Sequence, residues 1–158
     1  MTLPSSISTR LQYQHKSLIE LIDGLADSEI RMAVNPGKWS IFENIVHLET
    51  YQHIFIARVK KMLDQDGCSF PVYSAETDPL FHDHLSRPSH EVIHDLMTMR
   101  KEIASGMSSF NETDLAKKGI HPAFGEMNLT GWLNFFLLHE AHHLFTIFKL
   151  AARTRSGR

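Results

Sequence analysis

The chain has 158 residues, of which 16 are Lys or Arg and 18 are Asp or Glu, so its formal net charge is −2. A nearly balanced charge excludes a general nucleic-acid binder, which presents a basic face or tail. The hydrophobic fraction of 42% excludes a disordered chain. This length suits one domain, residues 1–158.

The same composition indicates where the protein works. No apolar run reaches the roughly 18 residues of a membrane span, and the N-terminus lacks the pattern of a signal peptide. The single cysteine, Cys68, excludes an internal disulfide. We therefore expect a cytoplasmic protein that does not associate with membranes.

Apolar residues at three- and four-residue steps predict four helices, at 7–25, 40–63, 89–110 and 130–152. The second begins at Ser40, which forms a capping-box pattern with Glu43. No segment shows convincing strand alternation. The long segments between the second, third and fourth helices allow crossovers, whereas short ones join antiparallel neighbours. We expect an all-α four-helix bundle with a crossover connection, in which residues 70–88 form an excursion on the surface.

Eleven histidines are the unusual feature of the composition. The string HExxH, which places two imidazoles on one face of a helix, occurs at 90–94 and at 139–143. His90 and His94 lie roughly 140° from their helix's apolar stripe, so we expect them to face solvent. His139 and His143 share a face with apolar residues, and buried imidazoles need partners. Helical periodicity does not show whether the partner of His139 and His143 is a bound metal or hydrogen bonds to other side chains, and the two interpretations have equal weight.

A catalytic zinc site usually has three protein ligands. The helical candidates for a third are His15, which lies near the stripe of the first helix, and His47 and His53 on the second. Helical periodicity does not choose among these three.

Three segments resemble motifs of one family. Residues 36–48 (PGKWSIFENIVHL) are similar to the start of the second helix in the DinB/YfiT-like superfamily, and residues 139–143 (HEAHH) to the HExHH block of its last helix. Residues 121–125 (HPAFG), followed by Leu129 and Thr130, resemble the segment before that helix. The order of the motifs over nearly the whole chain makes the resemblance specific.

The resemblance implies a four-helix bundle in up-down-down-up order and a metal site of three histidines, His47, His139 and His143. Zinc, nickel and manganese are the metals associated with the family, and zinc and nickel suit imidazole ligands. In the family the histidine block often continues with Gly-Gln. Leu144, Phe145 and Thr146 follow it here, so we expect a more apolar wall beside the metal.

Relatives that use bacillithiol, mycothiol or glutathione imply a thiol-dependent transferase acting on a small electrophile, with a low-molecular-weight thiol as cosubstrate. A metal-dependent hydrolase is the first alternative, with Glu140 as the base for water, because Glu140 follows a ligand directly. The second alternative is a non-catalytic binding protein of the stress-response kind, in which the metal has a structural role.

Other residues suggest weaker roles. Cys68 is expected in a turn with acidic neighbours, which disfavour a reactive thiolate. We expect Trp39 and Trp132 in the core or in a pocket wall. His142 is expected beside the metal or at an interface, and residues 82–84 (HDH) in a solvated loop. Leu138 and Phe145 project to the most polar side of the last helix and predict a homodimer, or cover by residues 64–88.

Overall fold

Four long helical segments lie side by side in the computed structural model, which describes residues 3–157. The first comprises α1 (Ser5–Tyr13), a 3-10 turn η1 (Gln14–Lys16) and α2 (Ser17–Ile22). The others are α4 (Ile41–Asp64), α6 (Ser89–Ser108) and α8 (Leu129–Ser156). All four predicted helices are present, although the first is interrupted by η1.

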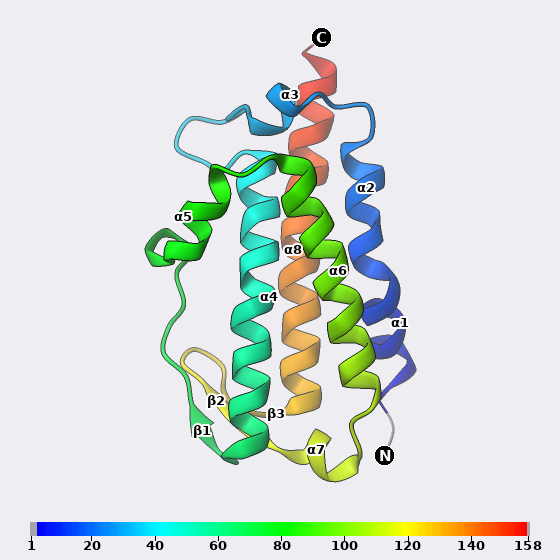
Figure 1. Ribbon diagram of the computed structural model, residues 1–158, viewed down its shortest axis with the longest axis vertical. Helices are drawn as coiled ribbons and strands as arrows, with labels where there is room; N and C mark the ends of the chain where they lie inside the picture. The colour runs from blue at the N-terminus through cyan, green and yellow to red at the C-terminus, as the bar shows by residue number, and fades with distance from the viewer. Residues whose placement is uncertain (1–2, 158) are drawn as a thin grey trace.

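The helices follow the expected order of directions. In Figure 1 the first segment runs upward from the N-terminus, α4 and α6 both run downward, and α8 runs upward to the C-terminus. Because α4 and α6 are parallel, residues 65–88 must return along the whole bundle between them. This return is the predicted crossover, and it contains η2 (Ala75–Thr77) and α5 (Pro79–Leu85).

Side-chain caps define where the two central helices begin. Ser40 Oγ accepts from the Glu43 N–H at 3.1 Å, and the Glu43 carboxylate accepts from the Ser40 N–H at 2.6 Å, so the predicted capping box is present. Asn128 caps α8 by accepting from the Gly131 N–H at 2.9 Å. These caps fix the registers from which the histidines of α4 and α8 project.

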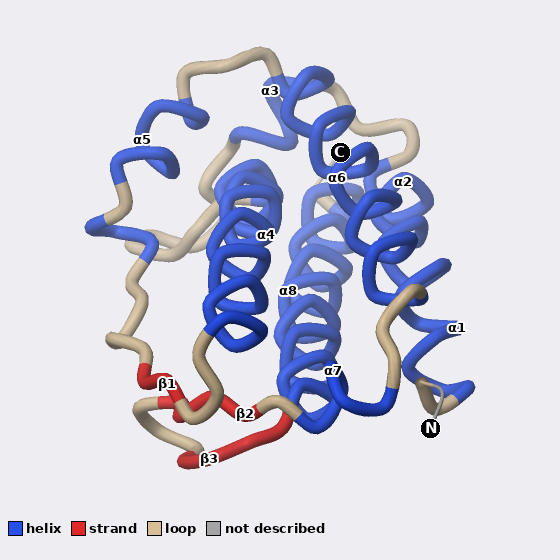
Figure 2. The backbone as a smooth tube through the Cα atoms, turned by 60° about the horizontal axis from the view of Figure 1, so that its bottom comes forward, coloured by secondary structure: helices blue, strands red, loops and turns tan. Residues whose placement is uncertain are grey.

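Short elements complete the fold, and a small sheet among them was not expected from the sequence. Helices α3 (Asp27–Arg31) and α7 (Glu112–Ala116) lie in the connections. Strand β2 (Lys118–His121) pairs parallel with β1 (Cys68–Ser69) and antiparallel with β3 (Gly125–Asn128). Figure 2 shows this sheet across one end of the bundle. The strands are only two to four residues long, which is too short for alternation to show.

The sheet also corrects the expectation for Cys68, which lies buried in β1 and not in a turn. Its partner in the register is Gly119, where a Cβ would lie 2.6 Å from Met62 Sδ. Only glycine allows the sheet to approach α4 so closely.

The hydrophobic core consists of two clusters separated by a polar layer. One cluster includes Phe55 and Trp132 near the sheet, and the other includes Ile45 and Ile147 at the opposite end. Between them lie buried or half-buried polar side chains, which are His15, His47, Gln52, Arg100, His139, Glu140 and His143. A layer of this kind is costly unless its members find partners.

The surface carries several other features that bear on the sequence predictions. Leu138 and Phe145 are 56% and 60% exposed, so the excursion at 64–88 does not cover them; α5 packs against α4 instead. The homodimer stays a prediction.

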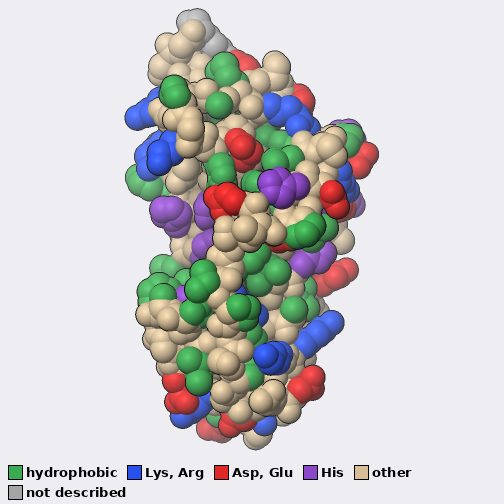
Figure 3. Space-filling model, turned by 90° about the vertical axis from the view of Figure 1, so that its left-hand side faces the viewer, with side chains coloured by type: hydrophobic (Ala, Val, Ile, Leu, Met, Phe, Trp, Pro, Cys, Tyr) green, Lys and Arg blue, Asp and Glu red, His purple; other side chains and the backbone are tan. Residues whose placement is uncertain are grey.

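Figure 3 views the molecule from the side of α5 and shows histidines at several places across its middle. Among the described residues, no helix is both long and apolar enough to cross a bilayer.

Candidate metal centre

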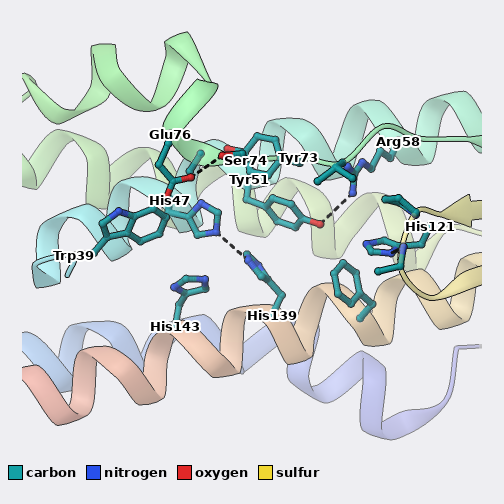
Figure 4. Close-up of a pocket in the computed structure, with 15 residues that line it drawn as sticks. Trp39, His47, Tyr51, Arg58, Tyr73, Ser74, Glu76, His121, His139 and His143 are labelled. Carbon is teal, nitrogen blue, oxygen red and sulfur yellow. Dashed lines mark hydrogen bonds between the residues drawn. The ribbon is translucent and has the colours of Figure 1, made fainter. Parts of the chain in front are cut away.

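Three histidines from two helices meet in the polar layer. His47 projects from α4, while His139 and His143 project from successive turns of α8. Each offers a ring nitrogen, and the three nitrogens lie within 4.8 Å of one another. His47 Nε2 and His139 Nε2 are 2.9 Å apart, as Figure 4 shows. Within residues 3–157 this is the one such group of potential metal ligands that the structure contains.

The other candidate histidines lie elsewhere. His15 is buried on η1, and His53 Nε2 lies 3.1 Å from a carboxylate oxygen of Glu49. His90 and His94 are exposed, as the helical wheel predicts. Of the three candidates that the periodicity left open, the structure therefore places only His47 beside the pair on α8.

A hydrogen-bond relay orients His143. Asn44 Nδ2 donates to the Ser40 carbonyl at 2.8 Å, which directs Asn44 Oδ1 toward His143 Nδ1, also at 2.8 Å. Because an amide oxygen only accepts, His143 Nδ1 carries the proton and Nε2 keeps its lone pair. Such outer partners commonly fix the tautomer of a metal-binding imidazole.

Burial keeps all three imidazoles neutral at pH 7. Desolvation lowers the pKa of His47 to about 4, and the carboxylates of Glu76 and Asp78 only partly oppose that effect. Desolvation lowers the pKa of His139 to about 3 and that of His143 to about 2, with the neighbouring histidines adding to both shifts. A metal ligand must be deprotonated, so these side chains are ready to bind a cation without first losing a proton.

The three histidines face a cavity of about 440 Å³. Its further walls come from α4 and the loop before it, from α8, from the crossover and from the hairpin at β2. They include Trp39, Tyr51, Arg58, Tyr73, Ser74, Glu76, His121 and Phe135. A volume of this size suits a small organic molecule. Trp39 is thus part of a pocket wall, as predicted.

Several of these cavity residues were not foreseen from the sequence. Tyr51 follows His47 by four residues, so the helical spacing could have revealed it. Tyr73 and Glu76 lie in the crossover and His121 in β2, where no periodic signal indicates a direction. Only the path of the crossover back along α4 brings Tyr73 and Glu76 to the histidines, and only the pairing of β2 with β1 places His121 there.

Comparison with known proteins identifies the family. Residues 10–147 match the sequence model of the DinB superfamily. The chain belongs to the DinB superfamily. It is 26% identical over 139 residues to the uncharacterized protein YuaE of Bacillus subtilis (strain 168), a match that covers 78% of this chain and 83% of YuaE.

Two solved structures share the fold of this DinB-superfamily chain. YfiT from Bacillus subtilis, described as "a probable metal-dependent hydrolase with an unusual four-helix bundle topology", superposes with a TM-score of 0.81 at 16% identity, over 94% of this chain and 86% of YfiT. TT2238, described as a four-helix bundle protein, gives 0.65 at 20% identity, over 90% and 95% of the two chains. At these identities the likeness concerns the fold alone.

The donor set of this DinB-superfamily chain fits a divalent cation. His47 Nδ1 and His139 Nδ1 are buried and have no hydrogen-bond partner among the described residues. A single N–H···N bond between the two Nε2 atoms would leave one of the imidazoles with an unpaired buried N–H at Nδ1 and the other with an unpaired lone pair. Mutual hydrogen bonding therefore uses only one of the inward-facing lone pairs, whereas a cation would use all three, with His47 and His139 each protonated at Nδ1.

Glu140, the candidate base, is not in the cavity. Its Oε2 atom accepts from Gln14 Nε2 at 2.7 Å and pairs with Arg100 Nη2 at 3.2 Å. It therefore faces α6 and the first helical segment, on the other side of α8 from the cavity lined by His139. Burial raises the pKa of Glu140, and the Arg100 charge opposes that effect.

The remaining candidates take other positions. His142 is exposed and lines a separate cavity beyond His143, and Trp132 is fully buried, with its indole N–H donating to the Gly119 carbonyl at 3.1 Å. The expectation of a solvated loop at 82–84 is right about the exposure of His82 and Asp83 but wrong about the loop and about His84. Those residues belong to α5, and His84 Nδ1 contacts the buried Glu49 carboxylate at 2.6 Å, which anchors the crossover to α4.

Proposed function

We propose that this protein is a divalent-metal-dependent enzyme that acts on a small molecule, with His47, His139 and His143 as the ligands. The observation that carries the proposal is the convergence of three neutral imidazoles at the wall of an open cavity. Three protein ligands with room for another group are typical of catalytic sites, whereas structural sites are closed by four. Zinc and nickel are the metals that the donor set suits best.

Hydrolysis is the reaction that the cavity supports best. A divalent cation held by three imidazoles supplies Lewis acidity and makes a water or thiol more acidic. Glu76 lies at the cavity beside His47, where its carboxylate accepts from Ser74 Oγ at 2.7 Å (Figure 4). This hydrogen bond lowers the pKa of Glu76, so the carboxylate is ionised at neutral pH. Glu76 therefore replaces Glu140 as our candidate general base. The description of YfiT agrees with this reaction class.

Thiol transfer is the second candidate, and the size of the cavity supports it. About 440 Å³ greatly exceeds the roughly 30 Å³ that one water occupies, so an organic cosubstrate has room beside the histidines. The chain supplies no thiol of its own there, because Cys68 is buried in β1. A low-molecular-weight thiol would have to enter from solution.

Elemental analysis of the tag-free protein tests the metal site. We expect about one zinc or nickel per chain, lost in each of the variants H47A, H139A and H143A. H53A and H142A are matched controls, because they remove a histidine outside the cluster and should keep the metal. Absence of metal after incubation with zinc, nickel and manganese would refute the proposal, as would retention in H47A.

Two assays on the metal-loaded protein separate the reactions. Release of nitrophenol from p-nitrophenyl acetate reports hydrolysis, and conjugation of glutathione to 1-chloro-2,4-dinitrobenzene reports thiol transfer. In the hydrolytic case E76Q should reduce the rate by about 10²–10⁴-fold while leaving the metal content unchanged. In the transfer case the rate should depend on the thiol. A tightly bound metal with neither activity over a broad panel of substrates would favour the structural role.

A further inference from the structure

A buried arginine stands at the end of the cavity away from the three histidines. Arg58 lies on α4, eleven residues after His47, and only 6% of its surface is exposed. Side chains of a helix lean toward its N-terminus, so the guanidinium reaches back along α4 toward Tyr51. Its Nη1 atom lies 3.4 Å from Tyr51 Oη, and Figure 4 shows it turned into the cavity between Tyr51 and His121.

Among the ion pairs of the described residues, none includes Arg58. Its hydrogen-bond acceptors are neutral, namely Tyr51 Oη and the Pro71 carbonyl, the latter 3.2 Å from Nη2. The guanidinium also lies 5.5 Å from the Phe70 ring centre and 5.6 Å from that of Trp132. Arg100, the other deeply buried arginine, does have an acid partner in Glu140. A buried cation without a counter-ion is costly, and an anion from outside would offset that cost.

The groups around Arg58 suit an anion as well. His121 Nδ1 accepts from the backbone N–H groups of Ala123 and Phe124, at 3.1 and 3.2 Å. The proton of the neutral ring is therefore on Nε2, which makes His121 a donor. The carboxylate that lines this cavity, Glu76, lies at its other end beside His47 (Figure 4). The cavity is thus cationic at one end and has metal-binding groups at the other.

We propose that the cavity binds a small organic anion, with Arg58 holding a carboxylate or phosphate group while the apolar body extends toward the three histidines. The fork of guanidinium donors matches the oxygens of such a group. The aromatic walls, which include Trp39, Tyr51, Tyr73 and Phe135, suit the apolar body. This inference deepens the proposed function, because it names the substrate class of the same site.

Binding of benzoate and of its neutral analogue benzamide tests the proposal. Titration calorimetry uses the full chain after removal of metal with a chelator, so that a carboxylate cannot bind to the metal instead. We expect benzoate to bind at least tenfold more tightly than benzamide. R58Q should abolish this preference, and R58K should retain part of it, because an ammonium is a point charge without the planar fork.

K149Q is the matched control. It removes the same unit of charge from an exposed lysine that lines the separate cavity beyond His143, so the preference for benzoate should be unchanged. Thermal unfolding shows whether each variant is folded. If R58Q does not fold, the test rests on R58K, whose preference for benzoate over benzamide should be weaker than that of the wild type. Equal binding of the two probes, no binding of either, or an unchanged preference in R58Q or R58K would overturn the proposal.

The metal analysis and the anion titration can fail independently. If elemental analysis finds no metal but benzoate still binds in preference to benzamide, the proposed enzyme is refuted and Arg58 stands as an anion site. If the chain binds metal as proposed but its metal-free form shows no preference for benzoate, the role of Arg58 is refuted and the metal site stands. Inorganic phosphate, added as a competitor, shows whether the subsite also accepts phosphate oxygens.

Discussion

Substitution of Glu140 by glutamine separates a structural role for this carboxylate from a catalytic one. Glu140 is the counter-ion of Arg100, whose side chain is 0% exposed. In E140Q the shape is nearly unchanged, but the Arg100 charge remains buried without a counter-ion. Arg100 Nε and Nη1 already lack partners among the described residues, so they cannot compensate.

The expected magnitude follows from the burial of the pair. Breaking a buried ion pair from one side typically reduces the free energy of unfolding by about 3–5 kcal/mol. For a domain of this size each kcal/mol lowers Tm by about 2–4 °C, so E140Q should lower Tm by roughly 6–20 °C. The metal content should stay at that of the wild type, because Glu140 faces away from the three histidines.

Urea unfolding and thermal unfolding measure the loss of stability, and elemental analysis measures the metal. The double variant R100M/E140L is the informative control. It replaces both charges by apolar side chains of similar length, so it should recover most of the stability that E140Q loses. An E140Q protein with unchanged Tm and strongly reduced activity would refute this reasoning and restore Glu140 as the catalytic base.

Three further outcomes are expected. Asn44→Ala removes the acceptor that orients His143, so the affinity for metal should fall about 10–100-fold with the histidines intact, as competition with a chromogenic chelator would show. Burial lowers the pKa of His15 from 6.5 to about 4, so its contribution to stability is present above pH 6.5 and is lost as the pH falls to 4. The full loss amounts to about 3 kcal/mol, of which about 2 kcal/mol falls between pH 7 and pH 4.5. In His15→Gln, the fall in the free energy of urea unfolding between these two pH values should be smaller by that amount. Gly119→Ala brings a Cβ against Met62 and should lower the free energy of unfolding by about 1–3 kcal/mol, whereas an unchanged urea midpoint would show that Met62 moves aside.

The helices could be predicted because their signals are local. The capping box at Ser40 and the apolar stripes place α4 and α8 within a few residues of their observed ends. The interruption at η1 and the three short strands had no such signal. A two-residue strand such as β1 exists only because the crossover brings it beside β2, and no window of sequence contains both partners.

The site was predictable only in part. Spacing on one helix shows that His139 and His143 share a face, and the family resemblance, not the periodicity, pointed to His47 as the third histidine. The rotation of α8 about its axis decides what lies on each side of that face. It directs Glu140 toward Arg100 and away from the cavity, although Glu140 is adjacent to His139 in sequence.

The sequence by itself determined the helical segments, the single-helix histidine pair and, through its motifs, the family. Caps and apolar periodicity act over a few residues, so they can be recognised in one segment at a time. Only the tertiary structure decided that Glu76 and Tyr73 from the crossover, Arg58 from α4 and His121 from β2 would line one cavity with the histidines. Their convergence depends on how helices pack and how the crossover returns along α4, and those contacts join residues far apart in the chain.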